Sequence, residues 1–137
     1  MTKTQGLRFR RHLSAPGLVK LTRKCFERID DPIKGHRTSL ADNMMAALAM
    51  SMFKFPSMLQ FDEFARGREA LPELIHNLET LFGIGHVPSD TSMRERLDAL
   101  DPQALRSAFK LAFSELQRCK GLEGVTSIDG HHCLALC

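Results

Sequence analysis

The sequence contains neither tryptophan nor tyrosine, and its nine phenylalanines fall mostly at the spacing of helix cores. Proteins that bind single-stranded nucleic acid stack bases on exposed aromatic rings, so we expect no such stacking platform here. No run of about eighteen apolar residues occurs, and the start MTKTQGLRFRRHL is basic without the apolar segment of a signal peptide. We therefore expect a cytoplasmic chain with no membrane partner.

Patterns that carry catalysis or bind metal are also missing. No serine follows a strand-to-helix elbow, and there is no glycine-rich phosphate loop. The spacing of the cysteines and histidines near the C-terminus matches no zinc finger or ribbon. These residues are Cys119, His131, His132, Cys133 and Cys137. We predict no catalytic residue, no metal site and no cofactor for this chain, and no structural disulfide.

The positions of capping residues and apolar residues predict a helical domain. A serine, or an aspartate followed by proline, precedes five apolar segments of helical period, and the apolar residues from Leu71 to Phe82 mark a further amphipathic helix that Gly83 closes. The five starts are Ser14, Ser39, Ser57, Ser89 and Asp101-Pro102. We predict an all-α bundle of about five or six helices over residues 14–120, between a basic arm at 1–13 and a short irregular or extended tail at 121–137. The segment 40–53 is apolar on most of its surface, which predicts the central buried helix.

The net charge of +3 conceals an uneven distribution of charge. Residues 1–38 contain ten Lys or Arg against three Asp or Glu, whereas the remainder contains nine against thirteen. Such clustering suits neutralisation of phosphates with release of counterions, although an ordinary solvated basic face is the alternative. The cluster consists of Arg8, Arg10, Arg11, Lys20, Arg23, Lys24 and Arg28, of which the first six are the candidate phosphate contacts.

The segment 88–118 reads as two short capped helices that meet at a corner. Units of this kind can present a helix to a DNA groove, and they are equally common as supports in helical cores. Arg94 and Arg96 are the candidate groove contacts. Residues two apart on a helix point about 200 degrees from each other, so both cannot face one groove. The alternative for one of them is pairing with the neighbouring Glu95 or Asp98.

Three strings carry a resemblance to a known family: SLADNMMAALAMSMFKFPSMLQFDE, NLETLFGIGHVPSDTSMRERLDALDP and ELQRCKGLE. Together they resemble the N-terminal region of insertion-sequence transposases of the DDE superfamily, from about Ser14 to the C-terminus. The resemblance implies a helical region that binds transposon-end DNA and helps to assemble the synaptic complex. It implies DNA and other transposase copies, self or full-length, as partners. In the family, divalent metals are held by the D-D-E acids of a following ribonuclease-H-like core.

Family members continue with a segment similar to N-G-H-Y-L-L and then D-G-T, whose aspartate is the first catalytic acid. Aligning Asp129-Gly130-His131 with N-G-H ends the chain at Cys137, where that acid is expected. In the other register Asp129 is itself that acid, with His131 in place of the threonine. Either register lacks the second aspartate and the glutamate. We therefore expect a truncated transposase N-terminal part that does not cut DNA alone. The alternative is a helical interaction or scaffolding domain that packs on the missing catalytic core and has no DNA affinity of its own.

Overall fold

The computed structural model describes residues 14–35 and 37–118, and within these ranges all regular structure is helical. The helices are α2 (Ala15–Phe26), α3 (Leu40–Met52), α4 (Met58–Arg66), α5 (Pro72–Thr80), α6 (Asp90–Asp98) and α7 (Pro102–Arg118). This architecture confirms the predicted all-α fold. The predicted arm at 1–13 and the tail at 121–137 lie outside the described residues.

Serine caps start four of the helices at the predicted places. Each serine hydroxyl accepts a hydrogen bond from the backbone N–H three residues later, at 3.0–3.2 Å. The four are Ser14, Ser39, Ser57 and Ser89. Such a cap contributes about 1 kcal/mol to stability. Asp42, three residues after Ser39, does not complete a reciprocal capping box, because its carboxylate binds Arg23 instead.

Helix α3 is the centre of the fold, as its all-round apolar sequence predicts. Seven of its residues are buried, and α2, α4 and α6 pack against it. The main core surrounds Met45, Ala46 and Ala49 with side chains from α4, α5 and α6 and the loop between α5 and α6. The largest of these fully buried partners are Phe61, Leu78, Phe82, Ile84 and Met93.

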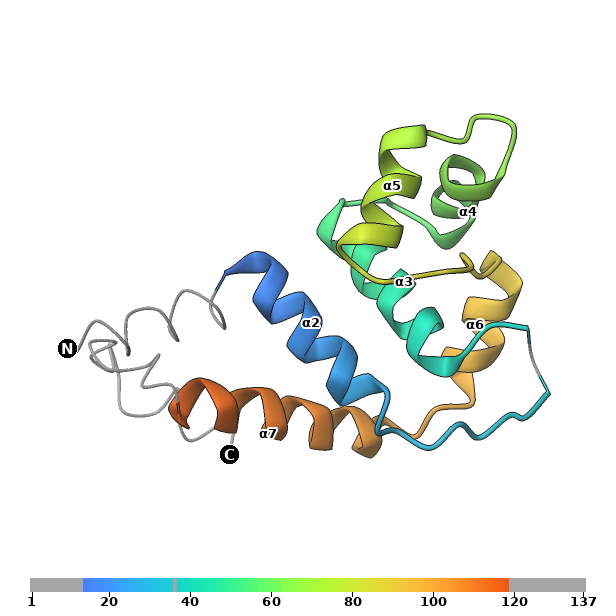
Figure 1. Cartoon of the computed structure of the whole chain (residues 1–137). Helices are drawn as coiled ribbons and strands as arrows, with labels where there is room; N and C mark the ends of the chain where they lie inside the picture. Colours follow the sequence, from blue (N-terminus) through green and yellow to red (C-terminus); the bar gives the residue numbers. More distant parts are fainter. Residues whose placement is uncertain (1–13, 36, 119–137) are drawn as a thin grey trace.

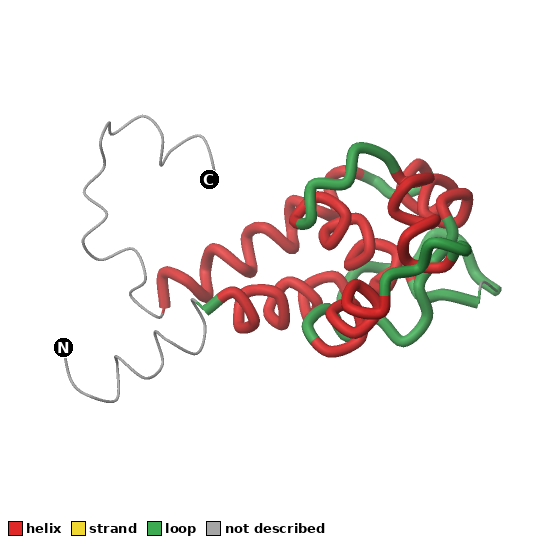
Figure 2. The backbone as a smooth tube through the Cα atoms, turned by 90° about the horizontal axis from the view of Figure 1, so that it is seen from above, coloured by secondary structure: helices red, strands yellow, loops and turns green. Residues whose placement is uncertain are grey.

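The helices divide into two parts in space. Helices α2 and α7 lie side by side and extend away from the group formed by α3 to α6 (Figures 1 and 2). The two helices of the segment 88–118 therefore serve different parts of the fold, since α6 packs on α3 and α4 whereas α7 packs on α2. Within the described ranges, no helix is both long enough and apolar enough to cross a membrane.

Candidate nucleic-acid interface

The polar face of α2 carries the main group of unpaired cations in this part of the chain. Lys20 and Lys24 are exposed and four residues apart, so they are neighbours on the helix surface. Arg28, in the turn that follows α2, is exposed as well. Among residues 14–35 and 37–118, none of the three makes an ion pair. We call Lys20, Lys24 and Arg28 the basic face of α2.

Arg23, which belongs to the same helix, is held by the protein. Its guanidinium donates to the Asp42 carboxylate at 2.8 Å and to Glu27 at 3.1 Å. A third hydrogen bond, of 3.2 Å, goes to the Phe82 carbonyl. Arg23 therefore joins α2 to α3 and to the turn that follows α5. It also engages Glu27, the one acidic side chain within α2 or its C-cap.

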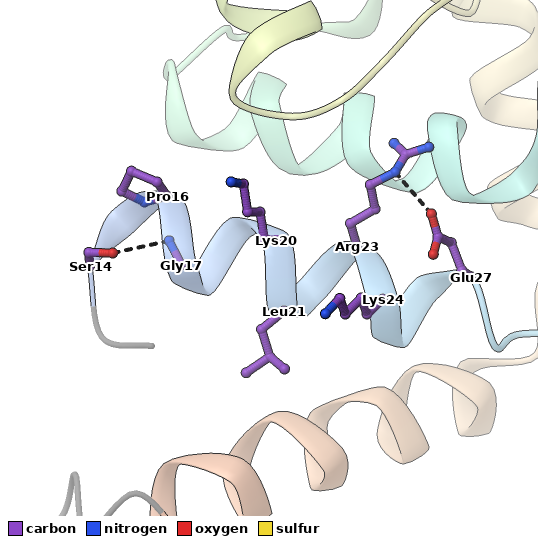
Figure 3. A pocket seen from close by; sticks show the side chains of 8 residues that line it. All are labelled: Ser14, Pro16, Gly17, Lys20, Leu21, Arg23, Lys24 and Glu27. Atoms are coloured by element: carbon purple, nitrogen blue, oxygen red, sulfur yellow. Dashed lines mark hydrogen bonds and ion pairs between the residues drawn. The ribbon is translucent and has the colours of Figure 1, made fainter. Parts of the chain in front are cut away.

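A pocket of about 510 Å³ lies along the length of α2, from Ser14 to Glu27. Lys20, Arg23 and Lys24 line it together with the capping Ser14. In Figure 3, Lys20 and Arg23 project on the side of α2 nearer α3, whereas Leu21 points the other way, toward α7. Ser14, at one end of this pocket, is where the described chain begins after the arm at 1–13. The candidate contacts Arg8, Arg10 and Arg11 belong to that arm, outside the described residues.

Arg94 lies on the outer face of α6, where its surroundings are acidic. Its side chain is 62% exposed, and its guanidinium lies 4.0 Å from the Asp90 carboxylate. Glu95 and Asp98 are exposed on the same short helix. A phosphate backbone laid on this face would meet more carboxylates than cations. The geometry of α6 therefore does not favour the predicted groove contact.

Arg96 is buried, with only 1% of its surface exposed. Its guanidinium binds both carboxylate oxygens of Asp31, at 2.8 and 2.9 Å, and donates to the carbonyls of Ile33, at 2.6 Å, and Thr38. These partners fix the segment between α2 and α3 against α6. The sequence-based assignment of Arg96 to a DNA groove needs correction, because the side chain faces the core and pairs with Asp31, not with Glu95 or Asp98. We leave it out of the candidate surface.

The remaining candidate chemistry is limited. Cys25 is buried, and burial raises the pKa of its thiol, while the charge of Arg28 acts in the opposite direction. In the part of the chain that the structure describes, no cluster of three or more His, Cys, Asp or Glu side chains could hold a metal ion. Cys119 and the histidines and cysteines after it lie outside that part.

No protein-family model, curated protein or solved structure matches this chain. The function must therefore be inferred from the geometry and charge of α2 and from the resemblance carried by the three strings.

Proposed function

We propose that this chain binds duplex DNA through the basic face of α2 and the basic arm that precedes it, as the N-terminal helical part of a DDE-type insertion-sequence transposase. One observation carries the proposal. Lys20, Lys24 and Arg28 are exposed without ion pairs among the described residues, while Arg23 engages the adjacent acid Glu27. The arm adds Arg8, Arg10 and Arg11 immediately upstream in sequence.

The dimensions of this face suit a phosphate backbone. Lys20 and Lys24 lie one turn apart on α2, about 6 Å along its axis, and one strand of B-DNA presents about two phosphates over that length. Arg28, in the turn after the helix, adds a third cation. Long, flexible side chains bind phosphates without reading base edges, so this face supplies affinity and position, not sequence preference. The interaction requires no metal ion, because the side chains neutralise the phosphates directly.

The test compares the affinity of the full chain and its variants for a labelled short duplex by fluorescence anisotropy. Replacing Lys20, Lys24 and Arg28 together by alanine should weaken binding by about tenfold or more at moderate salt, since three cations that displace counterions from the DNA are removed. Replacing the three arginines of the arm should have an effect of the same kind.

A matched control removes the same charge elsewhere: Lys34, Arg37 and Arg68 are exposed and make no ion pair within the described ranges. Their joint replacement by alanine should change the affinity by no more than about threefold, because only the long-range charge changes. Equal decreases in affinity in the two triple variants would mean that net charge, and not the basic face, determines binding.

A second candidate function is a helical interaction domain without DNA affinity of its own. The observation that favours it is an apolar outer surface on α7, where Phe109 is 72% exposed beside the exposed Leu105. Lack of any salt-sensitive DNA binding by the full chain would favour this candidate over the first.

A further inference from the structure

The outer surface of α7 combines an aromatic side chain with cations. Ala108 is buried, whereas Phe109 is 72% exposed, and Leu105 precedes it by one helical turn. Arg106 and Lys110 are exposed next to them and make no ion pair within residues 14–35 and 37–118. We call Leu105, Arg106, Phe109 and Lys110 the α7 knob. An exposed aromatic ring bordered by charge is typical of interaction surfaces.

A groove that is mainly apolar and carries one acidic residue, and so complements the α7 knob, lies between the end of α3 and the start of α5. Its volume is about 580 Å³, and five of its seven lining residues are apolar. They are Phe53, Phe55, Leu71, Pro72 and Leu74, with Glu73 and Asn77 completing the lining. Glu73 is exposed, is the one charged member, and makes no ion pair in the described part of the chain.

The aromatic walls of the groove are fixed by the core. Phe53 contacts Phe82 edge to face, with ring centroids 5.7 Å apart, and Phe55 contacts Phe61 at 5.4 Å. Between the two wall residues, Lys54 has a positive φ of 60°. This left-handed conformation costs a non-glycine residue about 1 kcal/mol or more. Lys54 is exposed and is not among the lining residues, so the strained residue lies in the turn between Phe53 and Phe55.

The knob and the groove lie too far apart to meet within one molecule. Figure 1 shows α7 below α2, whereas α5 and the end of α3 lie on the other side of α2. We propose that they meet between two copies of this chain, with Phe109 of one copy in the groove of the next. Arg106 and Lys110 then face Glu73, so apolar contact and opposite charge favour the same pairing. This contact is head to tail, because different surfaces of the two copies take part.

The proposal does not rest on DNA binding and is tested without DNA, by sedimentation velocity of the full chain over a range of concentrations. The wild-type chain should show a mass that rises with concentration. Phe109→Ser removes the knob, and the double change Leu71→Ser and Glu73→Lys removes the groove. Leu71 is the N-cap of α5 and makes no side-chain cap bond, so serine is compatible with the fold there. Each variant alone should associate at least about tenfold more weakly, so that it stays monomeric at the concentrations where the wild-type chain associates.

Mixing the two variants is the decisive step. The knob variant retains a groove and the groove variant retains a knob, so an equimolar mixture should form a dimer although neither variant associates alone. Leu59→Ser, at another exposed leucine outside both surfaces, should leave the association unchanged. A wild-type chain that stays monomeric at every concentration would overturn the proposal. Association of the groove variant alone would also overturn the proposal, because it would indicate contact between two α7 helices. A mixture of the two variants that does not assemble would overturn it as well. Far-UV circular dichroism should show equal helicity in all variants.

Discussion

Replacing Arg96 by alanine tests whether this buried side chain holds the segment between α2 and α3 in place. The guanidinium binds the Asp31 carboxylate and the carbonyls of Ile33 and Thr38. Alanine leaves all three acceptors without this donor and removes one of the largest fully buried side chains of the described core. The variant should therefore fold with markedly lower stability.

The magnitude follows from the burial of the partners. Removing one member of a buried ion pair costs about 3–5 kcal/mol, because the other charge is left without compensation. The Asp31 side chain is 31% exposed, so water restores part of its solvation and the lower end of that range applies. Arg96 also carries one buried nitrogen, Nε, without a hydrogen-bond partner in the described residues, which reduces its net contribution. A decrease of about 3 kcal/mol in the free energy of unfolding corresponds to a decrease in Tm of about 10–14 °C for a domain of about 105–137 residues.

The assay is urea unfolding followed by far-UV circular dichroism. Arg94→Ala is the matched control on the same helix, because that side chain is 62% exposed and its one ion pair is 4.0 Å long. It should change the free energy of unfolding by no more than about 0.5 kcal/mol. Arg96→Lys should lie between wild type and alanine, since an ammonium cannot reproduce the planar fork. If Arg96→Ala unfolds at the same urea concentration as Arg94→Ala, the structural role assigned to Arg96 is wrong.

Further predictions concern two positions, Gly83 and Cys25. Gly83 has a φ of +66°, so Gly83→Ala should lower the free energy of unfolding, measured in urea, by about 1 kcal/mol. Gly85→Ala, with no atom within 4 Å of its added Cβ, should lower it by less. Equal effects of the two substitutions would contradict this reasoning. In a chain whose other cysteines are replaced by serine, Cys25 should react slowly with a thiol reagent until denaturant is added, and fast reaction of the folded chain would contradict its burial. Burial raises the pKa of the Cys25 thiol in the folded state, so the protonated thiol makes its full contribution to stability below the ordinary thiol pKa. That contribution is lost as the pH rises through the folded-state pKa. Cys25→Ser should flatten that alkaline decline.

Features that depend on near neighbours in sequence could be predicted. Each serine cap is bonded to a backbone N–H three residues away, and the all-round apolar character of α3 indicates its central position.

Partners distant in sequence could not be predicted in this way. Arg96 pairs with Asp31, 65 residues earlier, and Arg23 pairs with Asp42 across two helices. The sequence offered only the local partners Glu95 and Asp98. One signal was present: Arg96 follows the apolar Met93 by three residues and precedes Leu100 by four, which places it on the core side of α6.

The candidate surface also differs from the predicted one once the helix faces are known. Arg28 belongs to the basic cluster in sequence but was not among the predicted contacts, and the structure shows it as an exposed cation in the turn after α2. Phe109 is an apolar residue in an amphipathic helix, and the sequence alone did not distinguish it from the core phenylalanines. Its exposure depends on which side of α7 packs on α2, and that side is fixed by tertiary contacts, not by the helical period.

The dependence of duplex affinity on salt concentration tests the proposed DNA binding most directly. Between about 50 and 200 mM salt, the logarithm of the association constant of the full chain should fall linearly with the logarithm of salt concentration, with a slope of about −3 or steeper. Removal of Lys20, Lys24 and Arg28 should flatten that slope by about 2.7, at about 0.9 for each phosphate that is no longer neutralised. An affinity independent of salt, or the same slope in the wild-type and triple-variant chains, would contradict the assignment of phosphate binding to the basic face of α2.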